Sequence, residues 1–462
     1  MPPRRTRPVA NRALAALIEQ AGWTHAATAQ HVNAVAAELG ERIHYDRSAI
    51  GHWLTGTVPR PEAVRAAVEA FRRRLDRPDL APSHLGWPAQ PAGRPWHDDP
   101  WRGDPVARLA TLGEDDLLNR RTVLTAGTFT LAALSGLTAE KRFQRYAGRT
   151  GAGDVARIRA ATASLADLDD QYGGGHARAA VAAYLSRDVT PLLREATGRA
   201  RPDLFAAAAE LSYLAAYMAM DAGANALAQR YYISTVRLAD EAGDLVLRAT
   251  ALRSMAVQAA ELGHDGEALA LADAAASALG GHGSRRTLAW ITGMRAEANA
   301  AAGARWDALS LLRRTETQLE RADSPPETEW TGNYRRESLE HQIGLTLTQL
   351  GDHATAARHY TASMNARRPV ELRTRVLIGL RAAHAFLRAG DPERAAATAL
   401  GLGDDVPLIA SARVRQELHR LRAGWQRHRG DPLVAEADAA VAPVAQSRSA
   451  SRSTWPGSRP QQ

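Results

Sequence analysis

Five glycines recur at nearly regular intervals from residue 223 onward, and this repeat limits the fold more than any other feature of the chain. Each has a small residue seven positions before it and an alanine five positions after it. Glycine readily adopts the left-handed backbone that ends a helix, and small residues let two helices cross closely. The pattern therefore predicts an array of helix pairs. The glycines are Gly223, Gly263, Gly303, Gly351 and Gly390, spaced 40, 40, 48 and 39 residues apart.

The clearest copy of the repeat is Leu-Gly-Asp-His-Ala-Thr-Ala-Ala-Arg-His-Tyr at 350–360, which resembles a tetratricopeptide repeat. The period exceeds the roughly 34 residues of that family, so longer helices or turns are expected. The resemblance implies a tetratricopeptide-type α-solenoid over residues 204–440, preceded by a helical connector at 121–203. The fold class expected for the chain is all-α.

Tetratricopeptide arrays bind partners along a concave face lined by the first helix of each pair. Carried onto this sequence position by position, the resemblance implies a face that binds a peptide, a protein or a small molecule. The alternative is that these side chains only pack between repeats or form ordinary surface. The positions are Glu210, Tyr213, Tyr217, Arg253, Trp290, Glu297, His341 and His384.

Near the N-terminus, residues 47–54 are predicted to form a short helix with one buried face. Asp46 is a good N-cap, and apolar residues recur at helical spacing at Ile50, Trp53 and Leu54. Small and cationic groups occupy the opposite face, at Arg47, Ser48, Gly51 and His52. A short helix with such a face suits a reader of the DNA major groove. We therefore interpret it as the recognition helix of a helix-turn-helix domain over residues 11–75.

The helices expected around it fit that domain with one departure. A first helix is predicted at 11–21 and a fourth at 61–75, where Pro61 suits a first helical turn. The second helix, however, continues through 33–39, and the connection at 40–45 is longer than the tight turn of the compact motif. The second helix is therefore expected to be extended, or the turn to carry an insertion.

Positive charge is concentrated in this region. Residues 1–75 contain eleven Arg and six acids, so a charge of 11 − 6 = +5 lies here, out of +8 for the whole chain. Contacts to phosphates dominate non-specific affinity for DNA, so this placement favours a nucleic-acid partner over an ordinary solvated surface. Residues 1–10 form a basic arm that is expected to be disordered.

The sequence around the short helix also resembles a known family. Ala-Gly-Trp-Thr at 21–24, Tyr-Asp-Arg-Ser at 45–48 and His-Trp-Leu-Thr-Gly-Thr-Val-Pro-Arg-Pro at 52–61 are similar to actinobacterial XRE (Cro/C1-like) regulators with C-terminal tetratricopeptide repeats. Some members regulate sporulation and antibiotic production in Streptomyces, often negatively. The resemblance implies specific binding of double-stranded DNA, with Arg47, Ser48 and His52 in base-reading positions and Arg60 on the backbone. The absence of cysteine fits a reducing cytosol, so a cytoplasmic protein is expected, and a homodimer is expected as well.

The remaining segments are expected to connect or flank these domains. Residues 76–120 are rich in Pro and Trp and are predicted to be a non-helical linker, with some of the tryptophans packed against a neighbouring domain. Residues 119–137 mimic a twin-arginine signal, but they lie behind a complete domain and are short for a membrane span. A buried helix is expected there instead, with no membrane association. Residues 441–462 are expected to form a disordered basic tail.

Catalysis has no support in the sequence. There is no cysteine, the histidines lack metal-ligand spacing, and Gly173-Gly174-Gly175 has neither the preceding strand nor the following Lys of a phosphate loop. No enzyme activity, cofactor or metal is therefore expected. The predicted function is sequence-specific transcription regulation controlled through the repeats, and the resemblance points to development or secondary metabolism as the regulated process. The alternative is a protein-protein scaffold with a vestigial helix-turn-helix.

Overall fold

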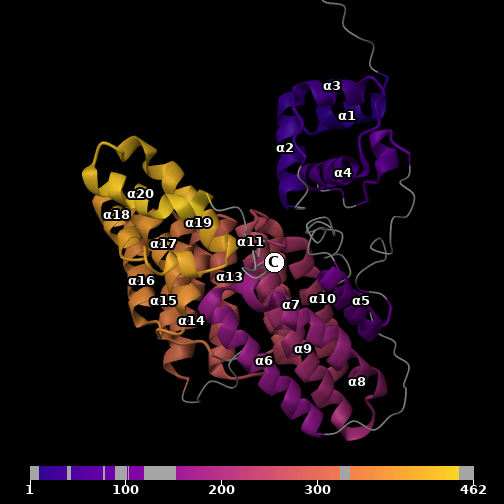
Figure 1. The fold of residues 1–462 in the computed structure, drawn as a ribbon, viewed down its shortest axis with the longest axis vertical. Helices are drawn as coiled ribbons and strands as arrows, with labels where there is room; N and C mark the ends of the chain where they lie inside the picture. The colour runs from indigo at the N-terminus through magenta and orange to yellow at the C-terminus, as the bar shows by residue number, and fades with distance from the viewer. Residues whose placement is uncertain are drawn as a thin grey trace, which may run out of the picture.

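The computed structural model describes residues 10–38, 43–75, 77, 79–88, 101, 103–118, 152–322 and 333–446. Every regular element in this part of the chain is a helix, so the expected all-α fold class is confirmed there (Figure 1). Most of the basic arm, the stretch at 119–137 and the tail from 447 lie outside the described residues. The described helices belong to an N-terminal body, residues 10–88, and a repeat body, residues 101–446.

The N-terminal body has four α-helices and a short 3₁₀ turn. Its second helix is extended, as expected, and the first and fourth occupy the predicted stretches. Apolar side chains from all of these elements form one core. The elements are α1 (Arg12–Gln20), α2 (His25–Glu38), α3 (Arg47–Leu54), α4 (Pro61–Leu75) and η1 (Pro82–Leu85).

The predicted linker is wrong at both of its ends. Residues 79–88 return to the N-terminal body, where Leu80, Leu85 and Trp87 are buried in its core. Residues 105–118 form a helix, α5 (Pro105–Leu118), because Pro105 occupies the first helical position and no proline follows within it. The connection between the two bodies is therefore much shorter than 76–120.

Helix α5 belongs to the repeat body. Its apolar side chains join the largest core cluster. The carboxylate of Asp116, which is buried, accepts hydrogen bonds from Arg178 and from the Tyr231 hydroxyl at 3.3 Å. These contacts attach the helix that follows the connection directly to the start of the repeat body.

The elements that precede the repeats pack beside α5. Gly173 has a positive φ of 87°, and the chain turns there between α6 and α7. The elements are α6 (Ala152–Tyr172), α7 (Gly174–Tyr184), a π-helical turn η5 (Leu185–Val189), α8 (Thr190–Glu195) and η6 (Gly198–Ala200).

Five helix pairs follow, and their register agrees with the glycine repeat. All five glycines lie between the helices of a pair with φ between 78° and 86°. The small residues on either side are buried where the paired helices cross. The pairs are α9 (Arg201–Asp221) with α10 (Asn225–Ala242), α11 (Leu245–Glu261) with α12 (Asp265–Leu279), α13 (Arg285–Ala301) with α14 (Arg305–Glu320), α15 (Arg336–Gln349) with α16 (His353–Ala366), and α17 (Leu372–Arg388) with α18 (Pro392–Leu400).

One register holds glycine where the others hold alanine, and the structure explains why. A Cβ atom on Gly344 would lie 2.6 Å from the ring of Tyr360 in the paired helix. Glycine at this position leaves the room that the Tyr360 ring occupies against α15.

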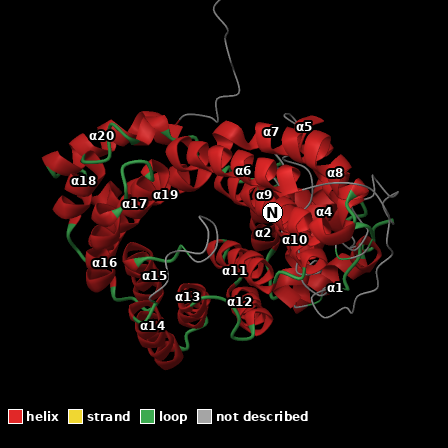
Figure 2. Cartoon of the chain, turned by 90° about the horizontal axis from the view of Figure 1, so that it is seen from below, coloured by secondary structure: helices red, strands yellow, loops and turns green. Residues whose placement is uncertain are grey.

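The repeats follow an arc that returns toward its start (Figure 2). After α18, the chain continues through η7 (Val406–Leu408), α19 (Ala412–Gly424), η8 (Trp425–His428) and α20 (Pro432–Gln446). Helix α17 packs against α6, and the backbone N–H of Ala410 donates to the carbonyl of Tyr172 at 2.7 Å. The last helices therefore contact the first ones of the same body.

Candidate functional site

Helix α3 is set by its own sequence. Asp46 is extended and its carboxylate accepts the N–H of Ala49 at 2.9 Å, which caps the helix. The apolar side chains at Ile50, Trp53 and Leu54 are buried in the core. Gly56, with φ at 104°, follows the end of the helix. One face of α3 is thereby committed to the core and the other is left outside.

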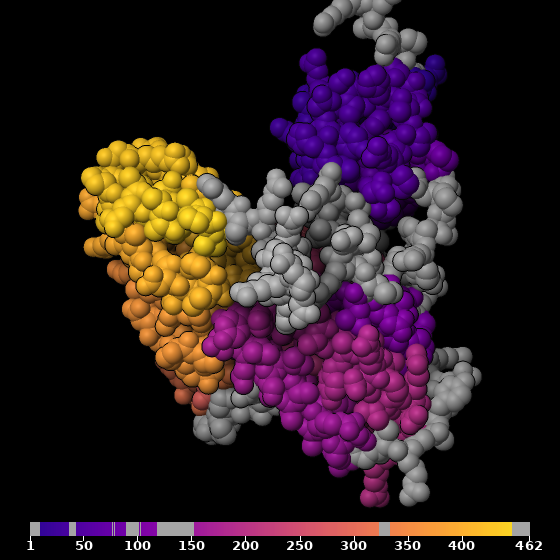
Figure 3. Space-filling model, viewed as in Figure 1, coloured from indigo at the N-terminus to yellow at the C-terminus, as the bar shows by residue number. Residues whose placement is uncertain are grey.

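The outer face carries the residues that the sequence singled out. Arg47, Ser48 and His52 are exposed, and among the described residues no side chain hydrogen-bonds to theirs. A Cβ atom on Gly51 would meet nothing within 4 Å. Helix α3 lies on the side of the N-terminal body that faces away from the repeats in Figure 1, and the indigo N-terminal body lies above the repeat body in Figure 3. This face can approach a large ligand closely.

Three other arginines of the body have structural roles. On α4, Arg72 donates from Nε to the carbonyl of Leu80 at 2.9 Å, and Arg74 donates to the carbonyl of Ala21 at 2.8 Å. Arg73 pairs with Glu69 on its own helix. Arg72 and Arg74 thus hold the returning segment and the end of α1 in place, and Arg73 is paired within α4.

Two further features lie at the C-terminal end of α3. Arg60 is exposed at the end of the loop that leads to α4. The backbone N–H groups of Ala10 and Asn11 both donate to the carbonyl of Leu54 at 2.9 Å. These bonds hold the backbone of Ala10 and Asn11 beside the C-terminal end of α3.

An aromatic row supports α3 from behind. The rings of Tyr45 and Trp53 meet edge to face with centroids 5.0 Å apart, and Trp53 meets Trp87 in the same way at 5.7 Å. The sequence placed Trp87 in a linker, although it did suggest that linker tryptophans pack against a domain. Its contribution to the support of α3 was missed.

The expected partner-binding residues lie on the inner helices of the arc, and most of them bind one another or a neighbouring helix. Tyr213 and Glu297 are buried, hydrogen-bonded to Ser254 and Gln342, so they are not on the accessible part of this face. The guanidinium of Arg253 stacks on the Trp290 ring at 4.3 Å.

The other four members of this set are partly buried. Glu210 pairs with Arg159 of α6 at 3.2 Å, and the hydroxyl of Tyr217 accepts from Arg373 at 2.9 Å. The Nε2 atom of His341 accepts a hydrogen bond from Arg381 at 2.9 Å. Burial, together with the positive charge of Arg381, holds the pKa of His341 well below its usual value. His384 is half-buried, and burial also lowers its pKa. A neutral His341 thus joins adjacent repeats.

A buried ionic cluster, which the sequence did not reveal, closes the arc. Arg373 of α17 is only 1% exposed. Its guanidinium donates to Asp169 at 3.0 Å and to Asp170 at 2.9 Å, both on α6, and lies 3.9 Å from Asp221 of α9. Asp221 in turn accepts from Ser411 and from the N–H of Gly174. The partners are about 200 residues apart in sequence, so no local pattern could indicate them.

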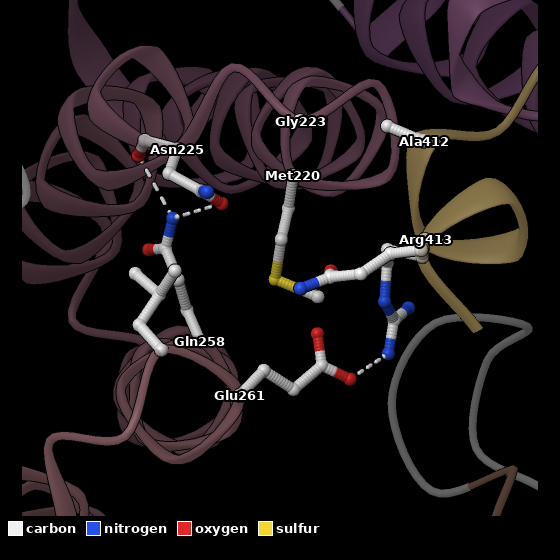
Figure 4. Close-up of a pocket in the computed structure, with 9 residues that line it drawn as sticks. Met220, Gly223, Asn225, Gln258, Glu261, Ala412 and Arg413 are labelled. Atoms are coloured by element: carbon white, nitrogen blue, oxygen red, sulfur yellow. Dashed lines mark hydrogen bonds and ion pairs between the residues drawn. The ribbon is translucent and has the colours of Figure 1, made fainter. Parts of the chain in front are cut away.

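A second ionic contact crosses the arc beside a small cavity (Figure 4). Glu261 of α11 accepts from Arg381 of α17 at 2.8 Å and from Arg413 of α19. Burial raises the pKa of Glu261, but the two guanidinium groups outweigh burial and lower it. The cavity measures about 40 Å³, room for roughly three water molecules and far less than the roughly 300 Å³ of a small-molecule pocket. Its lining comprises Met220, Gly223, Asn225, Gln258, Glu261, Leu262, Ala412, Arg413 and Gln416.

The ionic cluster predicts a pH dependence of stability. Burial raises the pKa of Asp169 to about 7 from 3.8; Arg373 opposes this rise, while Asp221 and Asp170 add to it. Because the folded state holds this proton more tightly than the unfolded state, Asp169 contributes stability below pH 3.8 that is lost as pH rises toward about 7. The Asp169→Asn variant mimics the protonated form, so its stability should fall less over that range. Urea unfolding at intervals between pH 4 and 8 checks this; parallel curves for both proteins would contradict it.

The described part of the chain has neither a cluster of metal-ligating side chains nor a membrane-spanning helix. No group of three or more His, Asp or Glu side chains there could hold a metal ion. None of the described helices is both long and apolar enough to cross a membrane.

Comparison with known proteins identifies one region. Residues 14–88 match the family model described as the SP15 N-terminal domain. The match ends just after Trp87, which agrees with the return of 79–88 to the N-terminal body and extends that body beyond the boundary expected at residue 75. Neither the curated proteins nor the solved structures contain a match to this chain.

Proposed function

We propose that this protein is a sequence-specific regulator of transcription that binds double-stranded DNA. In this proposal the N-terminal body is a helix-turn-helix domain of the XRE type. Helix α3 enters the major groove, Arg47, Ser48 and His52 contact base edges, and Arg60 contacts the backbone. Arginine pairs well with guanine in the major groove, and small groups allow the helix to approach.

The observation that carries the proposal is the outer face of α3. The guanidinium of Arg47 and the hydroxyl of Ser48 are exposed and are not hydrogen-bonded to other described side chains. The space beside Gly51 on the same helix is open. Core packing does not require Arg47 or His52, because Ile50, Trp53 and Leu54 supply the buried face. The excess of arginine in residues 1–75 supports a phosphate-bearing partner.

The repeat body supplies the control. We infer a tetratricopeptide-type solenoid that responds to a peptide, a protein or a small molecule, in a cytoplasmic homodimer. Helix α5, anchored through Asp116, connects the start of this body to the N-terminal body. A change in the repeats can therefore reach the DNA-binding domains through a short connection and alter their spacing on two half-sites. An operator affinity that no effector of the repeats changes would remove this control mechanism and leave DNA binding standing.

Arg47→Ala tests the DNA-binding proposal. In vitro selection with the wild-type chain from a random double-stranded library should enrich one motif. The variant should bind that duplex with about 5- to 150-fold lower affinity, since a base contact of this kind contributes roughly 1–3 kcal/mol. Titration by fluorescence anisotropy at fixed salt measures the loss.

Arg187→Ala is the matched control, because Arg187 is an exposed arginine on the repeat body and its removal lowers the charge equally. Its affinity for the selected duplex should stay close to that of the wild type. If no motif is enriched, or if both variants bind alike, the scaffold with a vestigial helix-turn-helix becomes the better account.

A further inference from the structure

The connection between α2 and α3 leaves a geometric problem. In a compact helix-turn-helix a turn of three or four residues sets the angle between the two helices. Here α2 ends at Glu38 and α3 begins at Arg47, so the backbone between them is too long to set that angle by itself. Something else must hold the start of α3 against α2.

The side chain of Asn33 does this. Its Oδ1 accepts the backbone N–H of Tyr45 at 2.8 Å, and its Nδ2 donates to the carbonyl of the same residue at 2.7 Å. The side-chain amide of Asn33, in the middle of α2, thus binds both the backbone N–H and the backbone carbonyl of Tyr45. Tyr45 directly precedes Asp46, the N-cap of α3.

Tyr45 is also fixed from the other side. Its ring meets Trp53 of α3 edge to face at 5.0 Å. The backbone of Tyr45 is therefore bound to α2, while its ring is bound to α3. Together the two contacts limit rotation of α3 about its own axis. That rotation decides whether Arg47, Ser48 and His52 point toward a ligand.

We propose that Asn33 is a positioning residue for DNA reading, which sets the orientation of α3 without touching DNA. This inference rests on the proposed function. A misoriented α3 still brings its charges near phosphates, but it no longer aligns side chains with base edges. The two hydrogen bonds from Asn33 to the backbone of Tyr45 form a clamp on the start of α3. Loss of this clamp should therefore reduce discrimination between sequences more than it reduces general affinity for DNA.

The chain offers a matched control for this residue. Asn11 also makes two hydrogen bonds to backbone groups: its Nδ2 donates to the carbonyl of Leu85 at 2.8 Å, and its Oδ1 accepts the N–H of Leu14 at 3.0 Å. It joins α1 to η1, so its side chain does not bind the segment that leads into α3. Asn11→Ala removes the same kinds of bond and should destabilise the body at least as much as Asn33→Ala, because Asn11 is more buried.

The experiment compares both variants in the full chain. For each, the affinities for the duplex selected by the wild type and for a scrambled duplex are measured, together with the thermal midpoint and hydrogen exchange across α3. In Asn33→Ala the ratio of the two affinities should fall about tenfold or more, and the amides of α3 should exchange faster. In Asn11→Ala the ratio should stay near the wild-type value even where the midpoint falls further.

Three results would count against the inference. An unchanged ratio in Asn33→Ala, or an equal fall in both variants, would show that Asn33 contributes only stability. A wild-type chain that selects no sequence would overturn the proposed function itself, and this result is visible before any variant is made. In that case faster exchange in α3 of Asn33→Ala would still establish the clamp as a structural contact, but not one that serves DNA reading.

Discussion

Replacing Arg373 with alanine should lower the free energy of unfolding of the repeat body by about 3–5 kcal/mol. The guanidinium is almost fully buried and binds Asp169, Asp170 and the Tyr217 hydroxyl. Without it, carboxylates from α6 and α9 lose their counter-charge in a site with little access to water. The contact between α17 and α6 should therefore open first, which urea unfolding and hydrogen exchange in these helices can detect.

Arg394→Ala is the control for this prediction. Arg394 also pairs with an aspartate, Asp391, but its side chain is 72% exposed, so its loss should cost at most about 1 kcal/mol. Adding Asp169→Asn to Arg373→Ala should recover part of the lost stability, because one uncompensated carboxylate is removed. Equal effects of Arg373→Ala and Arg394→Ala would show that the buried cluster does not hold the arc closed.

Trp53→Ala should destabilise the N-terminal body by about 3–5 kcal/mol. The side chain is 3% exposed and packs between Tyr45 and Trp87, so its removal leaves a cavity behind α3. A body of this size has a small core, and a loss of this magnitude is a large part of its total stability. In calorimetry of the full chain, a transition belonging to the N-terminal body should shift to lower temperature.

Trp306→Ala provides the comparison for that experiment. Trp306 is 78% exposed on α14, so alanine there should change the unfolding free energy by no more than about 0.5 kcal/mol. The transition of the repeat body should be unaltered by Trp53→Ala, since Trp53 lies in the core of the N-terminal body and the repeat body has a separate core. A single transition that shifts as a whole would contradict independent unfolding of the two bodies.

Local patterns in the sequence were sufficient for the candidate DNA-binding helix. Asp46 caps α3, and Ile50, Trp53 and Leu54 form its buried face, as predicted. Arg47, Ser48 and His52 were placed outside because residues at the intervening positions must point away from that face. Each of these conclusions depends on contacts within about one turn of helix, which sequence spacing reports directly.

The boundaries of the candidate domain were harder to predict. Proline-rich composition suggested a linker from residue 76, yet Leu80, Leu85 and Trp87 complete the N-terminal core. Proline disfavours helix interiors but not packed, irregular segments. The space between α1, α3 and α4 is filled only when these three side chains are added to the core. Amino-acid composition does not describe that space.

By itself the sequence determined the helical class, the register of the repeats and the outward face of α3. These follow from short-range periodicity, helix caps and the small residues that close packing of paired helices requires. Only the tertiary structure decided that Arg373 meets Asp169, that Glu261 meets Arg413 across the arc, and that Asn33 binds Tyr45. For the two contacts in the repeat body, the physical reason is that small rotations between successive helix pairs accumulate along the array. Their sum, which no single repeat contains, determines which distant charges come into contact.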